Sequence, residues 1–119
     1  MGYDALRNCT TGKENTAIGV EAMFTCSTGT ENVAVGYYSL YSLTTGNYNT
    51  AVGGNGCLSS LTTGSYNTAV GRQCGTSLTT GVENVCIGNH ALDTCSTGHE
   101  NVAVGYDALT AVTTGGGNV

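Results

Sequence analysis

Residues 32–52 read NVAVGYYSLYSLTTGNYNTAV and contain one short motif twice. Asn-Val-Ala-Val at 32–35 returns as Asn-Thr-Ala-Val at 49–52, which is 17 residues later. In each copy, β-branched residues stand two positions apart, the pattern of a short β-strand whose side chains alternate between two faces. Between the copies, Thr44, Thr45 and Gly46 are typical of a turn, because glycine adopts the positive φ that a tight corner requires. One unit is therefore predicted to hold short strands and turns.

The same unit fills the whole chain. Seven Thr-Gly pairs are each followed three residues later by an asparagine, and the step is 17 residues except for one step of 18 between Gly46 and Gly64. The extra residue falls within residues 53–56, Gly-Gly-Asn-Gly. Since no linker interrupts the pattern, residues 1–119 are predicted to form a single domain of seven repeats. The repeated asparagines are Asn15, Asn32, Asn49, Asn67, Asn84, Asn101 and Asn118.

This period predicts an all-β fold, a parallel β-solenoid of about seven coils. The repeat is shorter than that of paired-helix arrays, and Gly, Thr and Asn are poor helix formers. Coils stacked ~4.8 Å apart would make an in-register rod ~34 Å long. Two columns of Leu, Met and Cys are expected to fill the interior, and the asparagines to form an amide ladder. The strand alanines, such as Ala34 and Ala51, are expected to face a neighbouring chain.

Composition and charge exclude several functions. The net charge is −5, and the only basic residues are Arg7, Lys13 and Arg72, so no nucleic-acid partner is predicted. No apolar run approaches the ~20 residues that span a bilayer, so no membrane insertion is expected. The start at Met1 does not resemble a signal peptide. No nucleophile–base pair or carboxylate pair stands out, so we predict no enzyme, no catalytic residue and no cofactor.

The cysteines allow two interpretations, a metal site and disulfides. Cys86, His90, Cys95 and His99 are zinc-ligand types, but they lack the tight spacing of strong zinc motifs, so no metal is predicted. Stacking would place equivalent Cα atoms ~4.8 Å apart, within reach of a disulfide. We therefore expect at least one bond within two pairs; the alternative is free buried thiols, because bridges between directly stacked strands are strained. The pairs are Cys9 with Cys26 and Cys57 with Cys74.

Aromatic and acidic residues supply the candidate binding surface. Five tyrosines fall in the third and fourth repeats and are predicted to form a sugar- or protein-binding patch, with loop packing as the alternative. They are Tyr37, Tyr38, Tyr41, Tyr48 and Tyr66. One repeat position carries an acidic stripe, which we interpret as solvated surface rather than a cation site. Its residues are Glu14, Glu31, Glu83 and Glu100.

The motif also resembles a known family. The segments at 15–19, 32–36 and 101–105, Asn-Thr/Val-Ala-Val/Ile-Gly, are similar to the head repeats of YadA-like trimeric autotransporter adhesins. The longer form with Thr-Thr-Gly is similar to repeats of phage and large-virus fibre proteins. This resemblance implies a left-handed parallel β-roll, three chains around one axis, and an adhesive or structural rod outside the cell. It implies a homotrimer on a cell or virion surface, with a host surface glycan or protein as its partner.

Two further expectations concern surfaces and ends. The alternative function is a surface-binding solenoid for glycan or ice. Adjacent threonines such as Thr44 and Thr45 point opposite ways, so only one threonine column would face ice, and it lies at a turn. Joining residues 118–119 to residues 1–6 nearly recreates the sequence at 101–109. We therefore expect either a piece of a longer array or a chain that stacks head to tail into a filament, as a second form of self-association.

Overall fold

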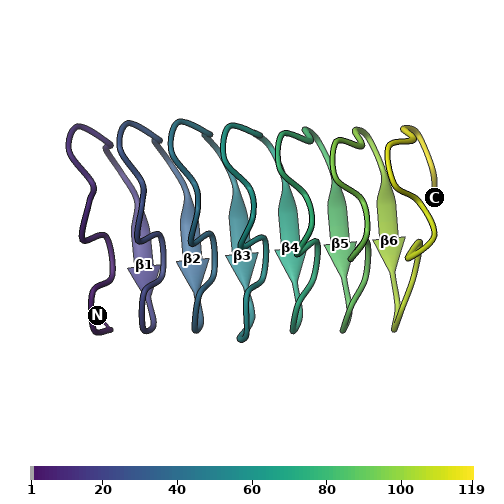
Figure 1. Ribbon diagram of the computed structural model, residues 1–119, viewed down its shortest axis with the longest axis horizontal. Helices are drawn as coiled ribbons and strands as arrows, with labels where there is room; N and C mark the ends of the chain where they lie inside the picture. The colour runs from purple at the N-terminus through teal and green to yellow at the C-terminus, as the bar shows by residue number, and fades with distance from the viewer. Residues whose placement is uncertain (1) are drawn as a thin grey trace.

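The computed structural model describes residues 2–119 and is a β-solenoid built from one sheet of six parallel strands. The strands follow one another in sequence order, and each is three residues long. They lie side by side along a rod with the two termini at opposite ends (Figure 1). The prediction of an all-β parallel solenoid is confirmed. The strands are β1 (Thr16–Ile18), β2 (Val33–Val35), β3 (Thr50–Val52), β4 (Thr68–Val70), β5 (Val85–Ile87) and β6 (Val102–Val104).

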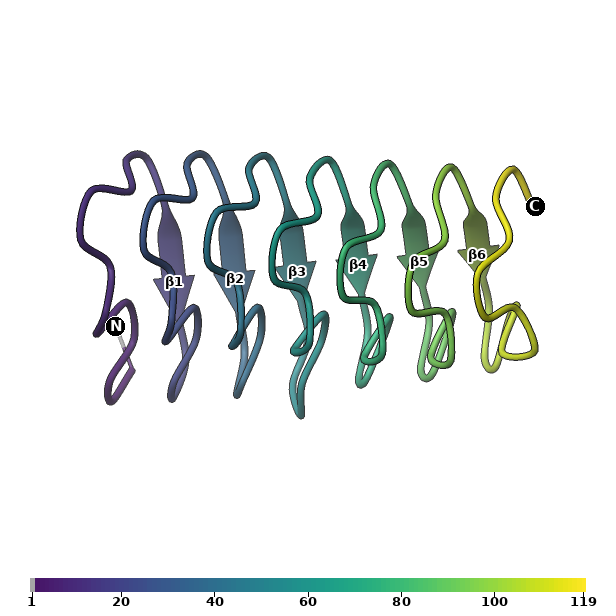
Figure 2. The same ribbon diagram turned by 45° about the horizontal axis from the view of Figure 1, so that its top comes forward.

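The rod measures 35 × 21 × 16 Å, close to the predicted length. Figure 2 shows that successive coils follow nearly the same path. The strands make about five turns from β1 to β6, fewer than the seven coils predicted. The first repeat forms only the segment that leads into β1, and the last repeat adds no strand. Two expectations above involve Met1: the comparison with a signal peptide and the joining of the two chain ends. Met1 lies outside the described residues.

The register explains how one extra residue is accommodated. Strand β2 pairs with β3 at Ala34 and Ala51, and β3 pairs with β4 at Ala51 and Ala69. The inserted residue lies outside the strands, in a loop where Asn55 and Gly56 have φ of 62° and 92°. Left-handed backbone of this kind favours Asn and Gly. The ladder therefore continues in register past the insertion, as a bulge at 53–56 predicts.

The strand alanines face inward, so the expectation that they meet a neighbouring chain is wrong. Ala34, Ala51 and Ala69 are fully buried inside the coil together with the two Leu/Met/Cys columns. Alternation along the strand places the flanking β-branched residues outside. The coil is narrow, so leucines from the opposite wall leave room only for a small strand residue. The outward face is therefore the one that carries Val, Ile and Thr.

The asparagine ladder is confirmed and is the polar core of the rod. The Oδ1 atom of Asn49 accepts hydrogen bonds from the backbone N–H and Nδ2 of Asn67, at 3.0 and 3.1 Å. Asn67 Nδ2 also donates to the carbonyl of Gly81 in the next repeat, at 2.9 Å. The same pattern runs from Asn15 to Asn118. Each buried amide thus ties its own coil to both neighbours.

Left-handed corners determine the cross-section of each coil. The leucine column, represented by Leu40 and Leu58, has φ of 49° and 51°, and the column of Glu31 and Glu83 has φ of 56° and 59°. Residues with a Cβ pay roughly 1–2 kcal/mol for this conformation. The interior leucines offset that cost by burial. The exposed glutamates do not.

Replacing Glu83 with asparagine is expected to stabilise the chain by about 0.5–1 kcal/mol, because asparagine tolerates left-handed backbone. Urea unfolding of the variant and wild type measures the difference. Glu83→Gln is the control, since it also removes the charge but keeps a side chain unsuited to this conformation. Equal gains in both variants would show that charge in the acidic stripe, and not backbone conformation, is responsible.

Candidate interaction surfaces

The outer sheet face is an uncharged surface that runs along the rod. It consists of the residues that flank the strand alanines, and its most exposed members are Ile18 (51%) and Val104 (64%). The face holds only Val, Ile and Thr, repeated at the spacing of the coils. The full set is Thr16, Ile18, Val33, Val35, Thr50, Val52, Thr68, Val70, Val85, Ile87, Val102 and Val104.

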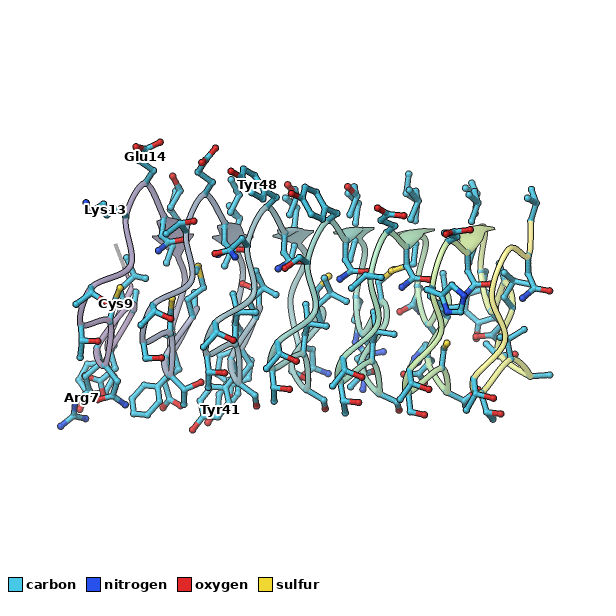
Figure 3. All side chains as sticks on the ribbon, turned by 90° about the horizontal axis from the view of Figure 1, so that it is seen from above. Arg7, Cys9, Lys13, Glu14, Tyr41 and Tyr48 are labelled. Carbon is cyan, nitrogen blue, oxygen red and sulfur yellow. The ribbon has the colours of Figure 1, made fainter. Side chains whose placement is uncertain are left out.

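A column of Glu and Tyr borders this face. Glu14 and Tyr48 point to the same side of the rod in Figure 3, and the strands lie nearer to that side. Every member of the column is exposed, as expected for a solvated stripe. Tyr48 and Tyr66 stack with ring centroids 5.0 Å apart and an interplanar angle of 9°. A hydrogen bond with Glu31 raises the pKa of the Tyr48 hydroxyl above its usual value.

The other three tyrosines lie elsewhere, so the predicted five-tyrosine patch does not form. Tyr41 points to the opposite side of the rod from Tyr48 (Figure 3). It stacks between Phe24 and Tyr38, with centroid distances of 5.3 and 4.7 Å. Tyr37 continues this ladder. Tyr41 and Tyr48 thus belong to one repeat but lie on opposite sides of its coil.

Stacking limits what either tyrosine ladder can bind. A sugar ring packs against the open face of an aromatic ring, whereas Tyr41 already stacks with both Phe24 and Tyr38. The ladder is extended by the Arg7 guanidinium, which lies 5.9 Å from the centroid of Phe24. A hydrogen bond with Glu21 and another with Tyr37 raise the pKa of Tyr38 to about 12. These contacts favour the alternative, loop packing, for this ladder.

All six cysteines are free thiols, so neither predicted disulfide is present. The thiols of Cys9 and Cys26 donate to the carbonyls of Gly12 and Gly29, at 3.8 and 3.7 Å. Cys57 donates to the carbonyl of Ala69 at 3.6 Å. Equivalent residues of stacked coils send their Cβ atoms in parallel directions, and a disulfide requires them to converge. Burial raises the pKa of Cys26 to about 11 and that of Cys57 to about 12.

The four zinc-type residues are not brought together. Cys86 and Cys95 are buried in the core, and His99 is exposed. Among residues 2–119, no group of three or more His, Cys, Asp or Glu side chains is arranged to hold a metal ion. Both cysteines instead occupy the apolar columns of the interior.

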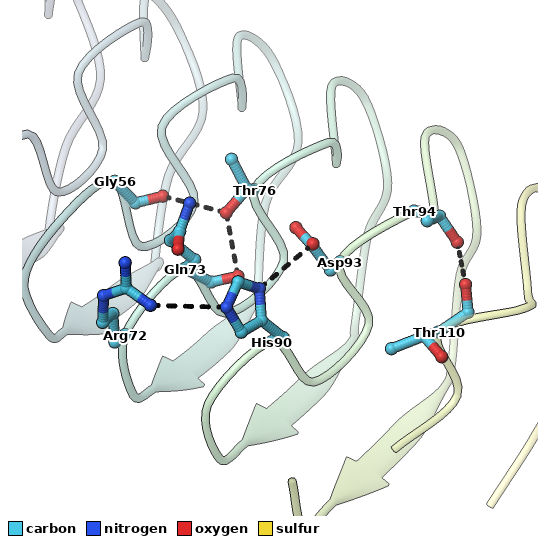
Figure 4. Close-up of polar contacts among 8 residues, drawn as sticks. All are labelled: Gly56, Arg72, Gln73, Thr76, His90, Asp93, Thr94 and Thr110. Atoms are coloured by element: carbon cyan, nitrogen blue, oxygen red, sulfur yellow. Dashed lines mark hydrogen bonds and ion pairs between the residues drawn. The ribbon is translucent and has the colours of Figure 1, made fainter. Parts of the chain in front are cut away.

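His90 lies in a polar contact that the sequence alone did not reveal. Its Nε2 is 3.4 Å from Nη1 of Arg72, and its Nδ1 is 3.3 Å from Oδ2 of Asp93 (Figure 4). A guanidinium only donates, so Nε2 of His90 is the side of the ring that faces a donor, and Nδ1 is the side that faces a carboxylate. Arg72 comes from the preceding repeat, and only the stacking brings it to His90. The contact links neighbouring coils at the rod surface.

The two threonine columns have different roles. Thr44 Oγ1 donates to the carbonyl of Thr62 at 3.0 Å, and Thr62 Oγ1 to that of Thr79 at 3.1 Å. The following threonine is exposed in all seven repeats, so one column faces solvent as predicted. The exposed column is Thr11, Thr28, Thr45, Thr63, Thr80, Thr97 and Thr114.

Residues 2–119 form no pocket. No helix long and apolar enough to cross a bilayer occurs among them either. Comparison with models of protein families, with curated proteins and with solved structures found no match to this chain. The surfaces available for function are therefore the outer sheet face, its Glu/Tyr border and the exposed threonine column.

Proposed function

We propose that this chain is a structural and adhesive rod module of an extracellular or virion fibre, without catalysis. The observation that carries the proposal is the outer sheet face, an uncharged array of β-branched side chains on a rigid rod. Contiguous apolar surface of this kind marks an interaction site in a soluble protein. The asparagine ladder supports a mechanical role, because it ties successive coils together along the rod.

A second copy of the same chain is the partner that best fits this face. The side chains recur at the coil spacing, so they interdigitate best with a surface of the same period. Another solenoid of this sequence has that period. Three copies with their sheet faces toward a common axis would cover the face and leave the loops outside. Head-to-tail stacking of coils is a second mode, since in-register ladders present complementary edges at their two ends.

Adhesion is the proposed use of the remaining surface. In such a trimer, the loops, which include the exposed threonine column, would stay outside. The partner we propose is a glycan or protein of a host surface. The second candidate function is surface binding without a fibre, and the exposed threonine column favours it, because the same residue recurs in all seven repeats. Ice shaping by the monomeric chain, with no fibre in electron micrographs, would favour this candidate over the rod.

Replacing Val70 with lysine is expected to abolish side-by-side association. The residue is 38% exposed in the single chain, so the change costs the monomer little, but in an assembly it would bury a charge. Native mass measurement is expected to give a trimer of about 36 kDa for the wild type, three times 12.0 kDa, and a single chain for the variant.

Thr63→Lys is the matched control, because it adds the same charge at an exposed turn outside the sheet face. It is expected to leave the mass unchanged. A wild-type chain that remains a monomer at high concentration would overturn the trimer, and a trimer that survives Val70→Lys would overturn the assignment of the interface.

A further inference from the structure

The coil at 71–87 departs from the others at two facing positions. Gly75 stands where most repeats have Leu or Met, and Cys86 stands where the other strands have Ala. A Cβ atom built on Gly75 would lie 3.3 Å from the sulfur of Cys86 and 2.8 Å from Cδ2 of Leu58. The larger strand residue therefore fills space that the missing leucine leaves. The two departures compensate for each other.

Cys74 precedes this glycine, and its column faces the strand of its own coil, because in the preceding coil the thiol of Cys57 reaches the carbonyl of Ala69, the residue equivalent to Cys86, at 3.6 Å. Cys74 and Cys86 are both at most 1% exposed. A hydrogen bond with the Cys74 thiol, together with burial, raises the pKa of Cys86 well above its usual value. Cys57 stacks below Cys74 in the same column, but its thiol donates to the carbonyl of Ala69. Within the coil at 71–87, Cys86 is therefore the cysteine that faces Cys74.

We propose that Cys74 and Cys86 are a redox-active pair that forms a disulfide across the interior of this coil. The two residues come from opposite walls, so their side chains converge, unlike those of stacked neighbours. With a small disulfide such as oxidised glutathione, one thiolate attacks a sulfur of the oxidant and releases one glutathione thiolate. The second cysteine thiolate then attacks the mixed disulfide and releases the other. Both cysteines lose a proton, and two electrons pass to the oxidant.

The bond would act as a staple on one coil. It would connect the wall at Cys74 to strand β5 and close a short loop in the unfolded chain. Buried thiols exchange only when the coil opens, so oxidation is slow in the folded rod and faster near its unfolding transition. Oxidation is expected to raise Tm by about 5–10 °C. The rod would therefore be more stable when this coil is oxidised than when it is reduced.

The experiment incubates the full chain with oxidised glutathione in urea near the unfolding midpoint, followed by removal of both. Cleavage after Arg72, Glu83 and Asp93 separates Cys57, Cys74, Cys86 and Cys95 into different peptides. The expected product has a Cys74–Cys86 cross-link, four titratable thiols out of six and a raised Tm. Six remaining thiols, or Cys57–Cys74 as the main cross-link, would overturn the proposal.

The matched control is the double variant Gly75→Leu with Cys86→Ala, which restores the residues of the other coils and so keeps the core filled. It is expected to fold, to form no bond at Cys74 and to show no shift of Tm on oxidation. A shift equal to that of the wild type would assign the effect to another pair and overturn the proposal. Cys57→Ala is a second control and is expected to retain the full shift.

Discussion

Replacing Asn67 with alanine is expected to lower the free energy of unfolding by about 3–5 kcal/mol, since each buried polar group left without a partner costs ~1–3 kcal/mol. The change removes the acceptor for the backbone N–H and Nδ2 of Asn84, both at 3.0 Å. It also removes the donor to the carbonyl of Gly81. These groups are buried and out of reach of water. Urea unfolding followed by circular dichroism measures the loss.

Two variants separate the ladder from the general effect of losing an asparagine. Asn47→Ala removes a half-buried amide whose Oδ1 accepts from the backbone and hydroxyl of Thr30, and it is expected to cost only about 1 kcal/mol. Equal losses at Asn47 and Asn67 would contradict a special role for the ladder.

Asn67→Asp places a carboxyl in the ladder, where burial and facing carbonyls raise its pKa above the unfolded value. Because the folded pKa is raised, this variant is expected to lose stability as pH increases above about 4 and to recover part of it below. A flat difference from the wild type between pH 3 and 7 would contradict this.

The sequence predicted which residues of adjacent coils lie next to each other along the rod, because equivalent positions of successive repeats stack. Strand positions, the asparagine ladder and the bulge at 53–56 all follow from the period. Repetition says nothing about which residues meet across one coil. The inward direction of Ala51, the separation of Tyr41 from Tyr48 and the approach of Cys86 to Gly75 depend on that cross-section.

The cross-section depends on corners with left-handed backbone, and the types of the residues at these corners do not predict that conformation. Leu58 and Tyr48 have φ of 51° and 58°, although bulky residues rarely adopt such values. Propensity rules would place these corners at Gly or Asn. Stacking stabilises these corners, because each corner repeats in register and its backbone forms a hydrogen bond with the next coil. The N–H of Leu58, for example, donates to the carbonyl of Cys74. Function follows only from surfaces, since residues 2–119 form no pocket and no group of three or more His, Cys, Asp or Glu side chains that could hold a metal ion.

Replacing Leu61 with alanine is expected to destabilise the chain by about 2–5 kcal/mol, because the side chain is fully buried and truncation leaves a cavity in a narrow core. The same column holds Cys26 and Cys95 in other repeats, so Leu61→Cys is expected to cost less than half as much. Urea unfolding ranks the two variants.

The position of Leu61 in the rod adds a second expectation. In a one-dimensional array each coil contacts only its neighbours, so a weakened central coil separates two segments that otherwise stabilise each other. Hydrogen exchange of Leu61→Ala should therefore show lost protection in strands β3 and β4 first, before the ends of the rod. Val112→Ala, in the same column at the half-buried last repeat, should cost clearly less and leave these strands protected. Uniform loss of protection in both variants would mean that the rod unfolds as one cooperative unit.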